Sequence, residues 1–380
     1  MSGRLVRWVC AAAVAGVLAA PGPAGALPEP DPGPGGEQSV AGLLTRLQEL
    51  YGEAEEATET YNATEEKLKE RRAEARALTE RLAAARGSLY GSRIAAGRLA
   101  RQQYQGRSDI SPYVRLLLAR DPLHALDQGH VVLRAARERK ATVDRLTGAE
   151  RRADVLATRA RAALDAQLRL AEERKKERDA VRSRLGDVEE LLASLTPEQL
   201  ADMSRLEETG ATASQRAFMA SGALGSAARA PSRAGDAALS YAVRQIGKPY
   251  VWGAEGPDSF DCSGLTSQAW AHAGRKIPRT SQEQWAKLPR VPLSRLRPGD
   301  LVVYFRRATH VALYLGGGKV VQAPRPGARV KVSPIAANPV LGAVRPDPED
   351  KPMSGYRPPP LPRGAMSGGD AGYDSPEGAS

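Results

Sequence analysis

The sequence predicts two structural parts: a long antiparallel pair of α-helices, and after it a compact α+β domain with helices packed on an antiparallel sheet. The helical pair is predicted because apolar residues recur at alternating spacings of three and four in two long stretches. Pro and Gly interrupt the chain between these stretches. The domain is predicted because, beyond residue 235, short helix signals precede several short strands bounded by Gly and Pro.

The first helical stretch follows residue 39 and keeps its apolar spacing over about seven heptads. Glu and Arg surround the apolar positions, as is typical of a coiled-coil seam, although Thr64 and Arg71 interrupt it. A helix of roughly 60 residues would be about 90 Å long. The apolar positions are Leu43, Leu47, Leu50, Ala54, Ala57, Tyr61, Leu68, Ala75, Leu78, Leu82, Ala85 and Leu89.

A break at residues 106–129 separates this stretch from a second one that runs from about Val131 to Leu195. The break contains Pro112 and Pro122, so we expect short helices at a turn, and a coiled-coil hairpin over 39–208. The apolar run at 116–118 in this turn is a candidate contact surface. Two histidines, His124 and His130, also lie there, but no Cys or carboxylate cluster at ligand spacing accompanies them, and we predict no metal site.

Residues 1–26 have the pattern of an export signal. Arg4 and Arg7 precede an apolar core that is too short to span a bilayer, and small residues at 24–26 form a cleavage site. We therefore expect the protein to be secreted and to act outside the cell. The Pro/Gly-rich segment 27–38 reads as a linker.

Three further boundaries follow from composition. An Ala/Ser/Gly/Arg-rich stretch predicts a flexible linker at 209–235, where proteolytic nicking could release the following domain. The α+β domain is expected at 236–348, and a Pro/Gly/Ser-rich, disordered tail at 349–380.

Positive charge is concentrated in the α+β domain. Residues 236–348 contain 16 Lys and Arg against 7 Asp and Glu, which accounts for nine of the chain's eleven net positive charges. Such a surface attracts polyanions, and for an exported protein we expect these to be anionic polymers outside the cell. Nucleic acid is a poor candidate because no nucleic-acid-binding motif accompanies the charge.

One cysteine, Cys262, remains once the export signal is removed, so it has no disulfide partner in the mature chain. Gly and Pro precede it, and helical apolar spacing follows it, which places the thiol at or near a helix N-terminus. The positive end of a helix stabilises a thiolate, the nucleophilic form. The alternative is that Cys262 is a small buried apolar residue.

A histidine partner for the thiol is available in His310. His272 lies almost three turns along the nucleophile helix and cannot reach the thiol. His310 opens one strand of a hairpin whose second strand, 319–323, can place Gln322 beside the imidazole. A nucleophile, a base and a polar group that orients the base are the parts of a cysteine hydrolase.

Five stretches, in order and spacing, resemble the NlpC/P60 family of papain-like cysteine peptidases, which cut bacterial cell-wall peptides. The resemblance covers about 237–345 and implies that Cys262 is the nucleophile, His310 the base and Gln322 the third polar residue. It also implies cleavage between γ-D-glutamate and the diamino acid of the stem peptide, without a metal or organic cofactor. The stretches are 247–253, 260–265, 278–281, 298–302 and 310–314.

The same resemblance implies three substrate-binding positions. Tyr250 matches a tyrosine that lines the site, and Asp261 and Ser263 match positions that hold the stem peptide. An amidase or acyltransferase on a related Cys/His fold would use the same residues on another bond. A non-catalytic wall-binding adaptor is the other alternative, although all three catalytic positions hold competent side chains.

The helical hairpin has three possible roles. It could be a spacer, an inhibitory arm, or an arm that binds a partner helix, because long exposed helices often pair with other helices. The resemblance to secreted relatives with such a hairpin implies either inhibition or recruitment by a membrane protein of the division complex.

Overall fold

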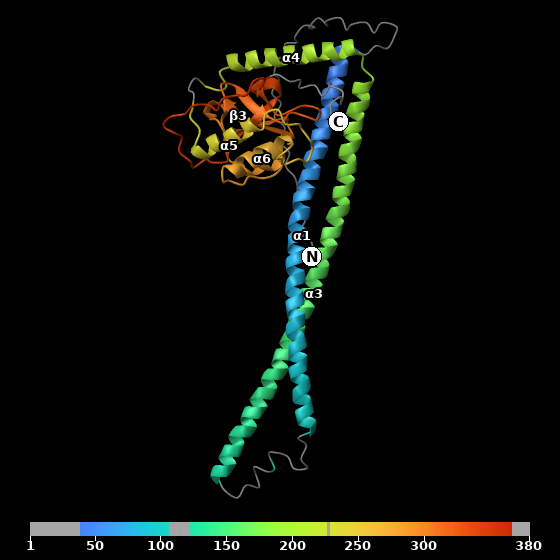
Figure 1. Ribbon diagram of the computed structural model, residues 1–380, viewed down its shortest axis with the longest axis vertical. Helices are drawn as coiled ribbons and strands as arrows, with labels where there is room; N and C mark the ends of the chain where they lie inside the picture. The colour runs from blue at the N-terminus through green and yellow to red at the C-terminus, as the bar shows by residue number, and fades with distance from the viewer. Residues whose placement is uncertain (1–38, 106–113, 115–121, 226–228, 367–380) are drawn as a thin grey trace, which may run out of the picture. The chain divides into compact units, whose positions relative to one another are not determined.

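A computed structural model describes residues 39–105, 114, 122–225 and 229–366 of the chain (Figure 1). The expected export signal, the linker at 27–38 and the apolar run at 116–118 lie outside the described residues. Among the described helices, none combines the length and the apolar character needed to cross a membrane.

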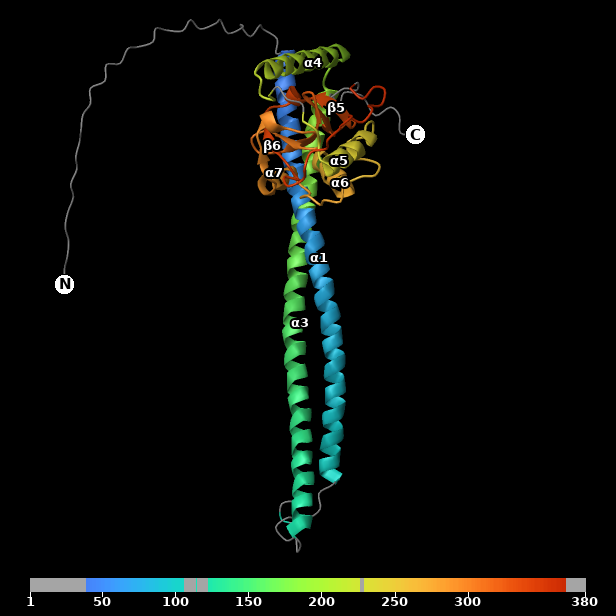
Figure 2. The same cartoon turned by 90° about the vertical axis from the view of Figure 1, so that its left-hand side faces the viewer.

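Two long helices form the N-terminal half: α1 (Val40–Gln105) and α3 (Pro122–Ala193). They run side by side in opposite directions (Figures 1 and 2). The expected long helical pair is confirmed, and its coiled-coil pairing stays a prediction. Side chains buried on the two helices include Leu43, Leu47, Leu50, Ala54, Leu68, Ala75, Leu82, Ala149, Ala153, Ala163, Val181 and Val188.

The expected turn at 106–129 is too long, because α3 already begins at Pro122. A proline is tolerated in the first turn of a helix, where its missing N–H has no partner to lose. His124 and His130 therefore belong to α3. No group of His, Cys, Asp and Glu within the described part of the chain could hold a metal ion.

A third helix, α4 (Pro197–Ala220), corrects the flexible linker expected at 209–235. Thr196 and Gln199 form a capping box that fixes its start. Its first half packs on α1 through Met203, and its last turns pack on the α+β domain through Phe218. Because both ends find apolar partners, the helix continues to residue 220, and the next helix begins at Arg233.

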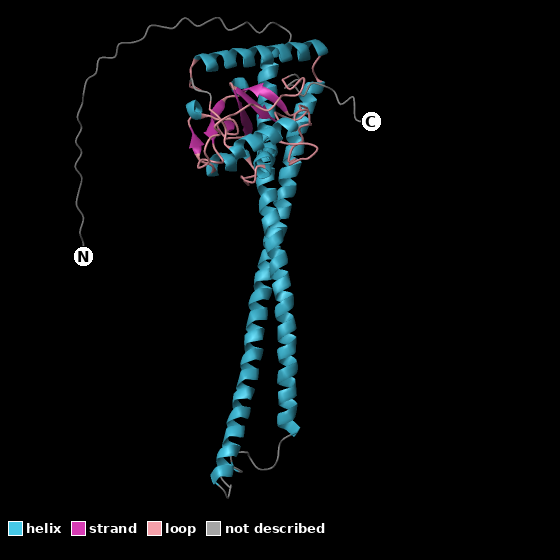
Figure 3. Ribbon diagram, turned by 60° about the vertical axis from the view of Figure 1, so that its left-hand side comes forward, coloured by secondary structure: helices cyan, strands magenta, loops and turns pink. Residues whose placement is uncertain are grey.

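The α+β domain contains one six-stranded antiparallel sheet, as expected (Figure 3). Its strand order is β1-β6-β2-β3-β4-β5, so β3, which carries His310, lies inside the sheet. The strands are β1 (Arg290–Val291), β2 (Leu301–Tyr304), β3 (His310–Gly316), β4 (Lys319–Gln322), β5 (Lys331–Pro334) and β6 (Val340–Val344). Two 3₁₀ turns, Leu293–Arg295 and Ile335–Ala337, connect them.

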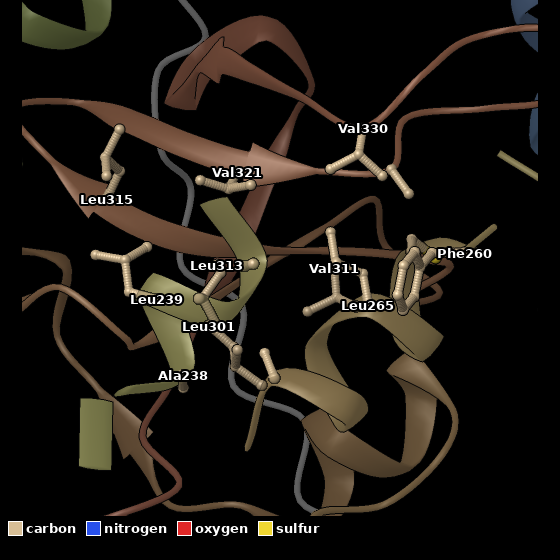
Figure 4. Packing of buried hydrophobic residues seen from close by; sticks show 14 of the residues in the cluster. Ala238, Leu239, Phe260, Leu265, Leu301, Val311, Leu313, Leu315, Val321 and Val330 are labelled. Carbon is tan, nitrogen blue, oxygen red and sulfur yellow. The ribbon is translucent and has the colours of Figure 1, made fainter. Parts of the chain in front are cut away.

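Both faces of the sheet are covered. Helices α5 (Arg233–Arg244) and α6 (Cys262–His272) pack against one face, where Leu239 and Leu265 meet Leu313 (Figure 4). Alternate strand residues such as Ala312 point to the second face, which Phe218 of α4 helps to cover. Because both faces are covered, inward and outward residues alike are apolar, and the strands have continuous apolar sequences. The short helix α7 (Ser281–Lys287) follows α6.

The disordered tail expected at 349–380 is wrong for residues 349–366. Ala365 is buried, and its carbonyl accepts a hydrogen bond from the Val332 N–H at the edge strand β5. The guanidinium of Arg297 donates to the carbonyl of Asp350. Composition alone missed this segment because its backbone bonds to the sheet edge, and such bonds leave no apolar period in the sequence.

Leu47 tests the packing between α1 and its neighbours. It is fully buried in a cluster with Leu50 and Met203, so Leu47→Ala should lower the free energy of unfolding by about 2–5 kcal/mol. Leu168→Ala on α3 is the matched control, since this leucine is 55% exposed and should cost less than about 0.5 kcal/mol. Urea unfolding followed by circular dichroism measures both. Equal losses of unfolding free energy in the two variants would contradict the burial of Leu47 between α1 and its neighbours.

Candidate active site

Cys262 is the first residue of α6, as the sequence predicted. Asp261 caps this helix, and its Oδ1 accepts a hydrogen bond from the Gly264 N–H at 2.6 Å. Gly264 has to be glycine, because a Cβ there would overlap the carbonyl oxygen of Ala254. The cap and the tight approach together fix the position of the thiol at the helix end.

His310 and Gln322 also lie together, as predicted. The imidazole Nε2 is 2.7 Å from Gln322 Oε1, while the Gln322 amide nitrogen donates to Ser333 Oγ at 2.8 Å. Because Ser333 fixes which end of the amide faces the ring, Gln322 accepts from Nε2–H. Nδ1 is then the ring nitrogen able to take a proton from the thiol.

The thiol lies against the start of β3. The backbone N–H of Val311, which follows His310, hydrogen-bonds to Cys262 in a way that favours the thiolate. Cys262 is buried, with 3% of its surface exposed. The α6 N-terminus and the β3–β4 hairpin thus bring the three predicted catalytic residues to one place.

The three predicted substrate-binding residues occupy different environments. Asp261 is fully buried, and Arg279 donates to both of its oxygens, at 3.0 and 2.7 Å. Ser263 Oγ accepts from Arg279 at 2.8 Å. Tyr250 is buried, and burial and the neighbouring Cys262 raise its pKa. Asp261 therefore positions its neighbours, whereas Ser263 also contacts a carboxyl group of α1.

Sequence reasoning missed a carboxylate from α1 that enters the site. Glu59 Oε1 accepts from Ser263 Oγ at 2.7 Å and lies 3.8 Å from Cys262 Sγ. The other oxygen, Oε2, accepts from the Ser281 backbone N–H at 2.7 Å. Glu59 is 1% exposed, so α1 covers Cys262, the predicted nucleophile.

A second glutamate of α1 covers the base. Glu55 Oε1 is 3.6 Å from His310 Nδ1, the nitrogen that the chemistry requires. One turn beyond Glu59, the buried side chain of Asn62 donates to Asp261 Oδ2 at 3.0 Å. The signal that could have found these residues is their spacing at i, i+4 and i+7, which places three polar groups on one helical face.

Exposed ion pairs surround this buried contact. Glu56 of α1 pairs with Arg307 at 2.5 Å, and Lys69 pairs with Glu255 at 3.0 Å. Exposed pairs of this kind contribute about 0–1 kcal/mol each. They set the register of α1 on the domain more than they strengthen the contact.

The electrostatics of the site keep the thiol protonated. Burial raises the pKa of Cys262 well above its ordinary value, and the carboxylates of Glu59, Asp261 and Glu55 raise it further. The thiolate stabilisation expected from the helix N-terminus is outweighed while α1 is in place. The sequence could not show this, because Glu55 and Glu59 lie some 200 residues away along the chain.

The two glutamates of α1 are perturbed as well. Burial raises the pKa of Glu59 from 4.5 to about 7, and neighbouring Asp261 adds to the rise, while Ser263 and Arg279 oppose it. Burial raises the pKa of Glu55 to about 8, with Arg325 opposing the shift. Both carboxyl groups therefore hold protons at higher pH than free glutamates would.

Comparison with known proteins identifies the domain. The sequence profile of the NlpC/P60 family matches residues 247–342. A probable endopeptidase of Corynebacterium glutamicum is 44% identical over 111 residues, which cover 29% of this chain and 53% of that protein. The chain thus matches about half the length of this curated relative.

Two solved structures are similar to about 30% of this chain. The NlpC/p60 domain of the peptidoglycan hydrolase SagA is 36% identical, covers 29% of this chain and 97% of its own, and has a TM-score of 0.28. RipD of Mycobacterium tuberculosis, described as a non-catalytic NlpC/p60 domain protein adapted to peptidoglycan binding, is 32% identical. It covers 30% of this chain and 98% of its own, with a TM-score of 0.28. The profile match, the curated relative and the α+β layout agree: this chain contains an NlpC/P60 family domain.

Proposed function

We propose that this protein is a secreted, wall-associated cysteine endopeptidase that cuts the stem peptides of peptidoglycan. The observation that carries this proposal is the His310–Gln322 hydrogen bond, which leaves Nδ1 as the ring nitrogen able to accept a proton, on the residue next to Val311, whose backbone contacts Cys262. The names of the relatives, a probable endopeptidase and a peptidoglycan hydrolase, support the substrate class.

The reaction that these residues support begins with proton transfer from the Cys262 thiol to His310 Nδ1. The thiolate sulfur attacks an amide carbonyl, and backbone N–H groups at the α6 N-terminus stabilise the oxyanion. His310 then gives its proton to the leaving amine as the C–N bond breaks. Water hydrolyses the remaining thioester, which restores the thiol and releases a carboxylic acid.

The bond cut is that between γ-D-glutamate and the diamino acid of the stem, by the resemblance of the motifs. Ser263 and the Ser281 N–H would hold the acyl side of the peptide, because these groups already bind a carboxylate, that of Glu59. Tyr250 would line the site beside Cys262. Anionic wall polymers would hold the basic domain near its substrate.

We further propose that α1 is an inhibitory arm. Glu59 occupies the surroundings of the nucleophile and Glu55 those of the base, so a stem peptide and α1 cannot bind together. A helix that only separates the domain from the membrane would not require buried carboxyl groups, because removing a carboxylate from water has a desolvation cost. A membrane protein of the division complex that binds the helical pair would relieve the block by withdrawing α1.

Two other functions remain as alternatives. RipD is described as non-catalytic, and a wall-binding adaptor would not need a competent site. Here Cys262, His310 and Gln322 are all present, Cys262 lies against the backbone of Val311 next to His310, and His310 is hydrogen-bonded to Gln322, which favours the enzyme. An amidase or acyltransferase would use the same residues, and identifying the product by mass separates these activities.

Asn62→Asp should open the site. The change removes the donor to Asp261 and sets two carboxylates together in a buried place, so α1 should detach and cleavage of peptidoglycan should rise at least roughly tenfold. Thr60→Asp is the matched control, because it adds the same charge on the exposed side of α1. Release of soluble fragments from purified peptidoglycan measures both. Equal rates in the two variants would contradict inhibition by α1.

Cys262→Ala should abolish this cleavage in the Asn62→Asp background. Mass spectrometry of the digest should show fragments that end at γ-D-glutamate with the cysteine and none without it, because the thiol supplies the nucleophile. Fragments cut at the amide between sugar and peptide would indicate an amidase instead. No fragments from any variant would favour the adaptor.

Raising the pH should weaken inhibition. The pKa values of Glu59 and Glu55 are raised to about 7 and 8 when α1 is docked and return toward 4.5 when it is released. Docking therefore binds protons: its free energy is most favourable below about pH 4.5 and declines as pH rises through 7 and 8. The cleavage rate of the wild type, divided by that of Asn62→Asp, should increase from pH 6 to pH 9. A constant ratio would show that these carboxyls do not govern docking.

A further inference from the structure

Arg325 is a buried cation beside the base of the site, and the catalytic proposal does not use it. It lies three residues beyond Gln322 and is 9% exposed. Glu207 of α4 pairs with its Nη2 at 2.9 Å, and the ring of Tyr51 on α1 lies 4.7 Å from its guanidinium carbon. It also interacts electrostatically with Glu55 of α1.

A cavity of about 380 Å³ adjoins Arg325. Gln322, Arg325 and Asn338 line it from the catalytic domain, while Tyr51, Glu55 and Glu207 line it from the helices. Gln322 links this cavity to the imidazole that it orients. The acidic lining comes from α1 and α4, so the helices supply the negative charge that faces the arginine.

The cavity lies on the leaving-group side of the proposed reaction. His310 gives its proton to the departing amine, so the residue that carries this amine has to lie near the imidazole. Ser263 and Ser281, which would hold the acyl side, belong to the α6–α7 region of the site. Gln322 ends β4 and bonds to the imidazole, and Arg325 follows it along the chain, so these two residues belong to the β4 side of the site.

Withdrawal of α1 together with the first half of α4, which packs on it through Met203, removes Glu55, Glu207 and the Tyr51 ring from Arg325. A guanidinium in a recessed place requires an anion, and its planar fork matches a carboxylate through two parallel hydrogen bonds. The residue leaving from a stem peptide can bring such a carboxylate. Diaminopimelate carries a carboxylate at the end of its side chain, whereas lysine at the same position carries none.

We propose that Arg325 binds the side-chain carboxylate of the leaving diamino acid and so selects diaminopimelate over lysine. This inference rests on the proposed function. Glu55 and Glu207 hold this carboxylate's place in the inhibited state. The helices thus block two substrate-binding regions with carboxylates: Glu59 of α1 beside Ser263, and Glu55 of α1 with Glu207 of α4 beside Arg325.

The experiment compares two peptides in the full chain carrying Asn62→Asp. One is L-Ala-γ-D-Glu-diaminopimelate and the other its lysine analogue, both with amidated C-termini, so that the side-chain carboxylate is the difference. The ratio of kcat/KM for the two peptides should favour diaminopimelate at least roughly tenfold. Arg325→Gln should bring this ratio within about threefold of unity, through loss on the diaminopimelate peptide.

Two further variants separate recognition from docking. Glu207→Gln breaks the same ion pair from the α4 side, so it should change kcat/KM for both peptides alike and leave the ratio in place. Arg325→Lys keeps the charge without the fork and should retain part of the preference. Because both peptides meet the same protein, partial opening or unfolding of a variant cancels in the ratio.

Three outcomes would overturn the proposal. A kcat/KM ratio near unity in the Asn62→Asp chain would show that the enzyme does not recognise the side-chain carboxylate. If Arg325→Gln leaves the preference for diaminopimelate unchanged, a group other than Arg325 recognises the side-chain carboxylate. If neither peptide is cut, while Asn62→Asp also releases nothing from whole peptidoglycan, the endopeptidase function itself fails, and this inference fails with it.

Discussion

The buried ion pair between Asp261 and Arg279 is the interaction on which the site depends. Asp261 caps α6, Arg279 donates to Ser263, and Oδ2 of the same aspartate accepts from both Arg279 and Asn62 of α1. A buried pair of this kind contributes little net stability, because desolvation offsets the attraction. What it provides is fixed geometry: the helix start, the serine hydroxyl and the landing place of the arm are all positioned by two side chains.

Charge complementarity then explains why the arm lies where it does. The catalytic domain carries most of the chain's net positive charge, and the face of α1 that meets it presents Glu55, Glu56 and Glu59. At long range this attraction guides α1 toward the basic surface. At short range the buried carboxyls gain hydrogen bonds and take up protons, so the contact combines specificity with an adjustable strength.

Sequence reasoning predicted the features that are encoded locally. The heptad spacing predicted two long helices, and the Gly/Pro pattern around 262 and 310 predicted the nucleophile helix and the hairpin that bears His310 and Gln322. It failed where structure depends on distant partners. The last turns of α4 and the segment 349–366 read as linker and tail, because their order comes from packing on the sheet. The place of Glu59 was equally hidden, since no local pattern pairs α1 with Ser263.

The α4 helix changes what proteolysis between the two halves would do. One end of α4 packs with α1 around Met203, and the other packs on the sheet through Phe218. A cut in the chain between α4 and α5 would therefore remove the covalent tether and leave the contacts between α1 and the α+β domain in place. With the tether intact, α1 has a very high effective concentration at the domain. After the cut, only its binding affinity for the domain would hold it there. If α1 inhibits as proposed, nicking alone would yield a two-chain complex whose activity rises on dilution.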